Sequence, residues 1–121
     1  LATGFPYNRR VAASNNTRML DHFLRRSQGV RRVGSAALDM AYVAWGRFDG
    51  YWEPLLSPWD VAGGLLLVEE AGGRISDFSG MRERLCSGAE VVASNGHIHD
   101  EMLTVLRYGA AAPHPDFPDL V

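Results

Sequence analysis

The sequence has a single cysteine, Cys86, no lysine, and no apolar run of about 18 residues. One cysteine excludes an internal disulfide and a cysteine-based metal cluster, and it suits a reducing compartment. Without a long apolar run, no segment of the sequence could cross a membrane as a helix. No signal-peptide pattern is visible either. Together these absences predict a soluble, cytoplasmic protein.

The charges are close to balanced. There are 14 acidic and 12 basic residues, which leaves a formal net charge of −2, and the arginines cluster only as pairs. Such a balance gives no general attraction to nucleic acid or to anionic lipid. We therefore expect neither nucleic acid nor a membrane as a partner. A length of 121 residues with 46% hydrophobic side chains fits one globular domain or part of one.

Short strand patterns alternate with longer helical patterns along the chain. After a short strand at 1–3, we expect helices at about 12–27, 35–45, 58–71 and 95–108, and strands at 30–33, 48–53, 74–77 and 90–94. This alternation predicts α/β architecture with a parallel or mixed sheet flanked by helices. Residues 1–109 should form the domain, and the proline-rich segment 110–121 a loose C-terminal tail.

The stretch 57–73 is the most strongly patterned part of the sequence. Ser57 suits an N-cap, Pro58 the first helical position, and Asp60 lies three residues after the cap, as in a capping box. Nearly every position from 61 to 68 is apolar or small, and Gly72 and Gly73 provide a left-handed stop. The pattern predicts a central helix that is buried on all sides.

Three positions could carry chemistry, and each also has a purely structural explanation. The strand-to-helix corner Gly34, Ser35 and Ala36 could present backbone N–H groups to a phosphate or hydroxyl, or it could be a tightly packed, capped corner. Glu53 could accept hydrogen bonds from sugar hydroxyls, or it could be a solvated strand end. Asp60 could bind a ligand, or it could only cap its helix.

The histidines and Cys86 give no support for a catalytic site. The four histidines are expected to be structural or exposed, because no two of them stand at a spacing that would form a metal site (His22, His97, His99 and His114). Cys86 has no paired histidine or helix N-terminus nearby in the sequence, so we interpret it as an incidental thiol.

Three motifs in order resemble the C-terminal half of the inositol monophosphatase family. They are Val-Arg-Arg-Val-Gly-Ser-Ala-Ala-Leu-Asp at 30–39, Gly-Arg-Phe-Asp-Gly-Tyr-Trp-Glu at 46–53, and Pro-Trp-Asp-Val-Ala-Gly-Gly at 58–64, followed by Glu-Ala-Gly-Gly at 70–73. The resemblance covers about residues 1–108. It implies the C-terminal part of a layered αβαβα sugar-phosphatase fold, and a Mg²⁺-dependent phosphomonoesterase in which metal ions activate water.

The same resemblance assigns roles to the candidate residues. It implies that Asp60 binds Mg²⁺ and also meets the substrate, that Gly34, Ser35 and Ala36 contact the substrate, and that Glu53 holds a substrate hydroxyl. No catalytic residue is separable from the metal site. The substrate would be a small phosphate monoester such as inositol monophosphate, and the protein would be a homodimer.

The sequence departs from the family in one respect. The Gly-Glu-Glu and Asp-Pro-(Ile/Leu)-Asp-Gly-Thr segments, which supply the other metal carboxylates, are absent. We therefore expect the chain to be truncated before Leu1, to work with an N-terminal half, to expose apolar surface without that half, and to have no appreciable activity alone. The alternatives are fructose bisphosphatase, bisphosphate nucleotidase or histidinol-phosphatase activity on the same fold, or a non-catalytic interaction fragment.

Overall fold

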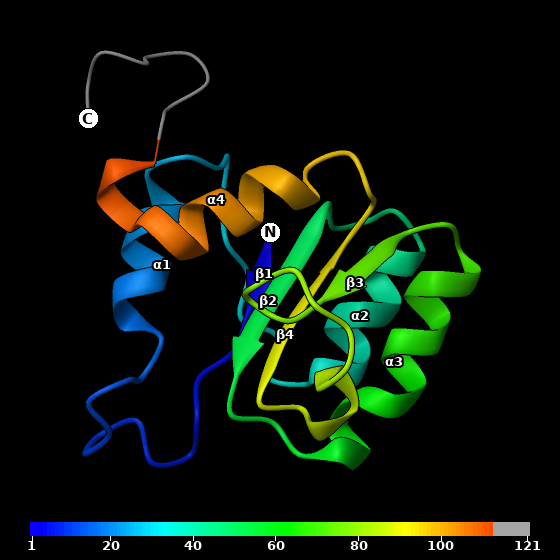
Figure 1. Cartoon of the computed structure of the whole chain (residues 1–121), viewed down its shortest axis with the longest axis horizontal. Coiled ribbons are helices and arrows are strands. Elements are labelled where there is room, and N and C mark those ends of the chain that lie inside the picture. The colour runs from blue at the N-terminus through cyan, green and yellow to red at the C-terminus, as the bar shows by residue number, and fades with distance from the viewer. Residues whose placement is uncertain (113–121) are drawn as a thin grey trace.

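The computed structural model describes residues 1–112, which form a mixed four-stranded sheet with helices on both faces (Figure 1). The strand order is β1-β2-β4-β3, where β1 is Ala2–Thr3, β2 Gly50–Pro54, β4 Glu90–Ser94 and β3 Arg74–Ser76. β1 runs parallel to β2, whereas the β2–β4 and β4–β3 pairs are antiparallel. The predicted α/β class and mixed sheet are confirmed.

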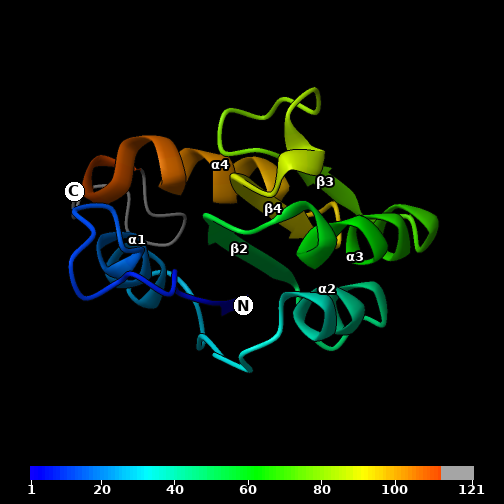
Figure 2. The same ribbon diagram turned by 90° about the horizontal axis from the view of Figure 1, so that it is seen from below.

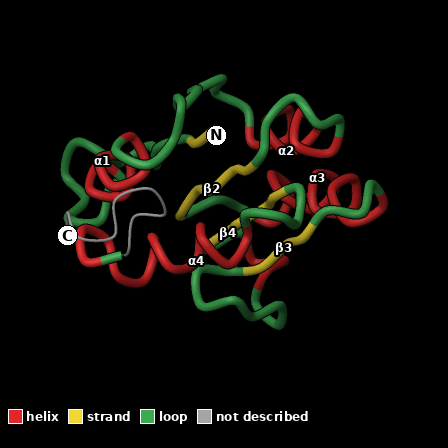
Figure 3. The backbone as a smooth tube through the Cα atoms, turned by 90° about the horizontal axis from the view of Figure 1, so that it is seen from above, coloured by secondary structure: helices red, strands yellow, loops and turns green. Residues whose placement is uncertain are grey.

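Two pairs of helices cover the two faces of the sheet. Helices α2 (Ala36–Ala44) and α3 (Pro58–Glu70) lie on one face, and α1 (Thr17–Leu24) and α4 (His99–Tyr108) on the other (Figures 2 and 3). The strands alternate between the two cores, as the two-residue period of a strand requires. Tyr51 packs with the α2 and α3 core, and its neighbour Trp52 packs with the α1 and α4 core.

Both α2 and α3 begin at the serines that the sequence indicates. Ser35 caps α2, because its Oγ accepts the Leu38 N–H at 3.3 Å. At α3, Asp60 Oδ2 accepts the Ser57 N–H at 2.9 Å, which is the reciprocal bond of a capping box. After α3, Gly72 adopts φ +85° in the left-handed region. The predicted start and end of α3 are therefore confirmed.

The two helices of this layer approach closely at Gly64. A Cβ atom at this position would lie 2.6 Å from the Met40 Cε of α2, so only glycine allows the observed packing. Gly63 faces open space instead, and its lack of a side chain is not required by any neighbour among residues 1–112. Of the two neighbouring glycines, only Gly64 is therefore required for the close approach of α3 to α2.

Helix α3 is not buried on all sides, contrary to the prediction. Val61, Leu65 and Val68 face the core, but Trp59 is 82% exposed, Leu66 57% and Leu67 51%. Among the described residues, a sheet lies against only one side of α3, so its outer apolar positions meet solvent. The sequence pattern shows that this outer side is apolar, but it does not show what covers the side.

Three other elements differ from the sequence prediction by more than two residues or do not form. Helix α1 is shorter than 12–27, and Asn16 before it takes a left-handed φ of 71°. The predicted strand at 30–33 does not form, since Arg31 makes only an isolated bridge to Ala2. Helix α4 begins at His99, because the Asn95 side chain holds the preceding residues in a turn by accepting the His97 N–H.

The tail prediction is only partly open to comparison. Residues Gly109–Ala111 form a short 3-10 helix, and residues 113–121 lie outside the described part of the chain. None of the helices within residues 1–112 is long and apolar enough to cross a membrane.

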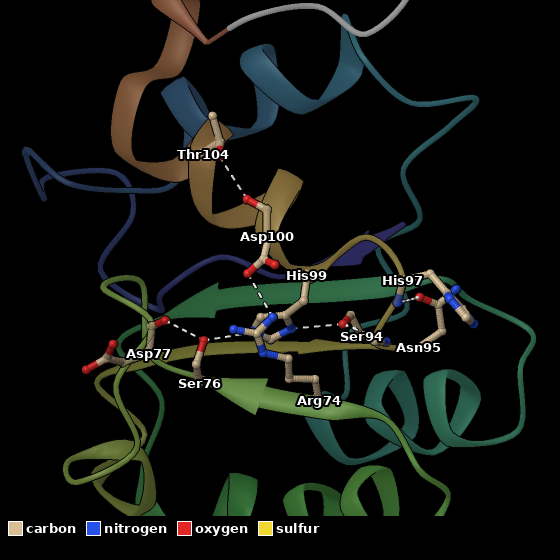
Figure 4. A network of polar contacts seen from close by, with 10 residues as sticks. Arg74, Ser76, Asp77, Ser94, Asn95, His97, His99, Asp100 and Thr104 are labelled. Atoms are coloured by element: carbon tan, nitrogen blue, oxygen red, sulfur yellow. Dashed lines mark hydrogen bonds and ion pairs between the residues drawn. The ribbon is translucent and has the colours of Figure 1, made fainter.

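A buried histidine joins α4 to the sheet (Figure 4). His99 is fully buried, with Nε2 2.8 Å from Ser76 Oγ of β3 and Nδ1 2.8 Å from Ser94 Oγ of β4. Ser76 donates its own proton to the Asp77 carbonyl at 2.8 Å, so it accepts from His99 Nε2–H, and Nδ1 accepts from Ser94. His99 is therefore a neutral structural residue, as expected.

Candidate functional site

The corner before α2 combines a strained backbone position with a helix N-terminus. Gly34 has φ +92°, in the left-handed region that glycine tolerates best, and Ser35 then starts the helix. The N–H groups of the first helical turn, beginning at Ala36, have no partner inside a helix and carry a partial positive charge. This corner can therefore hold an anionic or hydroxyl-bearing ligand.

Asp60 is a half-buried carboxylate in the first turn of α3. Its Oδ2 accepts the Ser57 N–H, whereas no hydrogen bond from residues 1–112 reaches Oδ1. The capping function expected from the sequence is thus present. It occupies one carboxylate oxygen and leaves the other for a ligand.

Glu53 is held from two sides at the end of β2. The side chain is 8% exposed, and the Tyr51 hydroxyl donates a hydrogen bond to its Oε2. Its carboxylate also packs directly over Gly4, where any added Cβ would collide with the carboxylate oxygens. Residues 51 and 53 share one face of the strand because side chains alternate. Glu53 is therefore a fixed carboxylate rather than a solvated strand end.

A second polar group positions Gly4 beneath Glu53. The Asn16 Nδ2 donates to the Gly4 carbonyl at 2.6 Å and to Thr3 Oγ1 at 2.8 Å, and Asn16 Oδ1 accepts from Trp52 Nε1 at 2.8 Å. Asn16 thereby ties the 3–4 segment to β2. The left-handed backbone of Asn16 is the conformation that asparagine adopts more readily than most residues.

The carboxyl groups of this region influence one another. Burial raises the pKa of Glu53, the hydrogen bond from Tyr51 and the charge of Arg32 lower it, and the charge of Asp60 raises it. Burial raises the pKa of Asp39 to about 7, a shift that the Glu53 charge reinforces and Arg32 opposes. The pKa of Tyr51 is also raised, first by burial and then by Glu53. We call the carboxyl groups of Asp39, Glu53 and Asp60, together with the Tyr51 hydroxyl, the carboxyl cluster.

The charge of Asp60 thus raises the pKa of Glu53, and Asp39 belongs to the same helix as the corner. The Asp39 N–H donates to the Ser35 carbonyl at 2.9 Å, so Asp39 lies one helical turn behind the corner. Sequence reasoning missed Gly4, Asp39 and Tyr51. The two-residue spacing of Tyr51 and Glu53 was a usable signal, whereas nothing local marks Gly4 as the neighbour of a residue 49 positions away.

Two further observations bound the site. A cavity of about 960 Å³ between Phe23, Phe48 and Met102 includes none of the predicted site residues in its lining. Within residues 1–112, no three His, Cys, Asp or Glu side chains are grouped so that they could hold a metal ion. The carboxyl cluster lies outside this cavity and does not by itself form a three-ligand metal site.

Comparison with known proteins identifies the family of the chain. Residues 1–109 match the sequence profile of the inositol monophosphatase family. The chain belongs to this family. The match runs from the first residue of the chain through α4 and leaves out the proline-rich tail, so the family predicted from the three motifs is confirmed.

Named relatives of this family are similar over most of the chain. An inositol-1-monophosphatase from Synechocystis is 44% identical over 93% of the chain, and the Nus factor SuhB from Escherichia coli K12 is 45% identical over 88%. The solved inositol monophosphatase from Anabaena (Nostoc) is 47% identical over 88% of the chain with a TM-score of 0.83. These matches show that the described elements are those of the family fold.

The chain is much shorter than these family members. It spans 38% of the Synechocystis protein, 40% of SuhB and 42% of the Anabaena chain. The four-stranded sheet and its helices are therefore part of the larger family fold.

Proposed function

We propose that this chain contributes one part of the active site of a Mg²⁺-dependent phosphomonoesterase that hydrolyses inositol monophosphate or a related polyol phosphate. The observation that carries the proposal is the carboxyl cluster beside the α2 corner. It places a carboxylate with a free oxygen, a fixed hydroxyl acceptor and a helix N-terminus on one side of the sheet. Membership of the inositol monophosphatase family supports this reading.

Asp60 suits a magnesium site but does not complete one. Mg²⁺ prefers carboxylate oxygens and retained waters, and Asp60 Oδ1 is such an oxygen. When bound, the metal would activate water for attack on the phosphorus atom of the ester. Since no three suitable side chains group together within residues 1–112, the remaining ligands would come from sequence outside this chain.

The other residues would bind and orient the substrate. The N–H groups at Ser35 and Ala36, with Gly34 allowing close approach, would contact the phosphate ester. Glu53, held by Tyr51 and backed by Gly4, would accept a hydrogen bond from a polyol hydroxyl. In this assignment Asp60 serves both metal and substrate, and no further catalytic side chain is required from the chain.

The test uses the complete protein that contains these residues. We expect it to release phosphate from inositol 1-phosphate with Mg²⁺ and to lose this activity when the metal is chelated. Fructose 1,6-bisphosphate, 3′-phosphoadenosine 5′-phosphate and histidinol phosphate serve as comparison substrates. A preference for any of these would refute the inositol assignment. The 121-residue chain alone should release no phosphate, and metal-dependent turnover by it would contradict our assignment of the other ligands.

A non-catalytic interaction module is the second candidate function. The exposed apolar positions Trp59, Leu66 and Leu67 on α3 favour it, because such a face calls for a covering partner. One relative is named a Nus factor, so at least one similar protein carries a name other than that of a phosphatase. Sedimentation of the chain as a monomer would count against this candidate and against the predicted homodimer, whereas self-association would favour them.

A further inference from the structure

Asn16 stands at the start of α1, but its side chain does not cap that helix. An asparagine at this position usually accepts an N–H of the first helical turn. Asn16 makes no such bond, although its backbone carbonyl accepts the Leu20 N–H at 3.0 Å. The residue is 4% exposed, and all the hydrogen bonds of its side chain go to β1, β2 and Gly4. The side chain therefore serves the sheet rather than its own helix.

The amide of Asn16 holds the backbone against which the Glu53 carboxylate lies. Its Nδ2 donates to the Gly4 carbonyl at 2.6 Å, and a longer bond of 3.5 Å reaches the same oxygen from Thr3 Oγ1. A Cβ atom at Gly4 would collide with the Glu53 carboxylate, so the Gly4 backbone is in direct contact with this group. A displacement of Gly4 would therefore change the surface on which the carboxylate rests.

The two carboxylate oxygens of Glu53 differ in their partners. Oε2 accepts the Tyr51 hydroxyl, whereas no hydrogen bond from residues 1–112 reaches Oε1. Oε1 is therefore the oxygen available to a polyol hydroxyl. A carboxylate held at one oxygen can still rotate about that bond, and the contact with Gly4 limits the rotation. The direction of Oε1 consequently depends on where Gly4 lies.

We propose that Asn16 is a positioning residue that fixes Gly4 and thereby sets the direction in which Glu53 Oε1 meets a substrate hydroxyl. The substrate part of this inference rests on the proposed function, whereas the linkage from Asn16 through Gly4 to Glu53 does not. A hydroxyl remote from the phosphorus atom contributes equally to binding of the ester and of the transition state. Loss of this orientation should therefore raise KM and leave kcat unchanged.

The kinetic test compares two esters in the complete protein. Asn16→Gly removes the side-chain amide, and glycine tolerates the φ of 71° at this position. KM for inositol 1-phosphate should rise on the order of tenfold. 4-Nitrophenyl phosphate has no hydroxyl for Glu53, so its KM should not change. An equal rise for both esters, or no rise for inositol 1-phosphate, would overturn the proposal.

Two control variants separate orientation from stability. Trp52→Phe removes the bond from Trp52 Nε1 to Asn16 Oδ1 and leaves both bonds from Nδ2, so it should lower stability without changing KM. Asn15→Gly makes the same substitution one residue earlier, where the side chain bonds to Arg9 and Thr17. It should also leave KM unchanged. A tenfold rise in either control would contradict the assigned route.

The dependence on Glu53 is tested in a second background. In Glu53→Ala the acceptor is absent, so adding Asn16→Gly should cause no further rise in KM for inositol 1-phosphate. A further tenfold rise in the double variant would show that Asn16 acts by another route and would overturn the proposal.

Crystal structures of the complete protein test the linkage without turnover. In Asn16→Gly, the Glu53 carboxylate should leave its position over Gly4 or occupy more than one position, whereas Trp52→Phe should keep the parent arrangement. An unmoved carboxylate in Asn16→Gly would overturn the proposal. If the protein hydrolyses no inositol 1-phosphate, the proposed function fails, and these structures alone decide the linkage.

Asn16→Asp replaces Asn16→Gly if the latter does not fold. It keeps an oxygen for Trp52 Nε1 but removes both donors, so the Glu53 carboxylate should again be displaced. The added charge acts on both phosphate esters, so the ratio of their two KM values is compared. This ratio should rise on the order of tenfold for inositol 1-phosphate over 4-nitrophenyl phosphate, and an unchanged ratio would refute the linkage.

Discussion

Two buried polar regions of this protein lie on opposite faces of the sheet and differ in how their hydrogen bonds are satisfied. At the joint between α4 and the sheet, both ring nitrogens of His99 have serine partners at 2.8 Å. In the carboxyl cluster, Asp39 has no partner within residues 1–112, and Asp60 uses only one oxygen.

This difference separates structure from function. A buried polar group that is fully hydrogen-bonded stabilises and orients the elements around it. A buried group left without a partner costs stability, and such costs are found where a ligand or a reaction needs the group. The joint around His99 is accordingly a structural feature. Because His22 Nδ1 and Arg26 Nε also lack partners within residues 1–112, the carboxyl cluster is the candidate site through its residue types as well as its missing bonds.

The largest expected effect is on catalysis. In the complete protein, Asp60→Asn keeps the shape and an oxygen for the Ser57 cap but removes the charge that would bind Mg²⁺. We expect kcat/KM to fall by a factor on the order of a thousand, with less than about 1 kcal/mol change in unfolding free energy. Phosphate release and urea unfolding measure the two quantities. If kcat/KM fell only as far as the loss of unfolding free energy explains, Asp60 would only cap its helix.

At the joint around His99, we expect a substitution to reduce stability. His99→Ala leaves Ser76 and Ser94 without their ring partners and opens a cavity between α4 and the sheet. We expect unfolding free energy to fall by about 3 kcal/mol. Denaturant unfolding of the chain measures this loss. A loss of less than about 1 kcal/mol would show that the joint does not hold α4 in place.

The two regions should respond to pH in opposite directions. Burial lowers the pKa of His99 from 6.5 to about 4, so its contribution to stability is full above pH 6.5 and falls as the pH drops toward 4. Burial raises the pKa of Asp39 from 3.8 to about 7, so its contribution is full below pH 3.8 and is lost as the pH rises toward 7.

The stability contributions of His99 and Asp39 change with pH in opposite directions. Replacing one of the two residues should therefore reveal the pH dependence of the other. Asp39→Asn should leave a chain that loses on the order of 2 kcal/mol on acidification from pH 6.5 to 4. His99→Gln should leave one that loses a similar amount as the pH rises from 3.8 to 7. Unfolding measured across this range checks both, and the same slope in the two variants would contradict the comparison.

The smallest effect is expected at the surface beside the joint. Arg74 pairs with Asp100 at 2.8 Å, but both side chains are substantially exposed. Arg74→Ala should therefore cost less than about 1 kcal/mol, and added salt should reduce the difference. Thermal unfolding at low and high salt measures it. A cost as large as that of His99→Ala would place the strength of the joint in the ion pair instead.

Local patterns in the sequence predicted many of the elements but not their surroundings. The serine caps of α2 and α3 and the bounds of β4 were predictable, because caps and strand alternation depend on residues within a few positions of each other. The expected strand at 30–33 is reduced to Arg31, whose backbone bonds to Leu1 and Thr3 beside β1, while its neighbours in 30–33 form no bridge.

The candidate site likewise combines local features that the sequence predicted with surroundings that it did not predict. Gly34, Ser35, Ala36, Glu53 and Asp60 were chosen from motifs, and the structure supports the local geometry expected of the corner and of the Asp60 cap. Their roles toward metal and substrate stay predictions. The environment of Glu53 was not predictable, because it depends on Gly4, which lies 49 residues earlier and meets the carboxylate only in the folded chain.

The sequence by itself determined the family, the α/β class and the start of α3, because these follow from motifs and from contacts of one helical turn or one strand period. Only the tertiary structure decided that α3 is half exposed, that His99 is satisfied and that Asp39 is buried without a partner. The physical reason is that burial and hydrogen-bond satisfaction are set by segments distant in the chain.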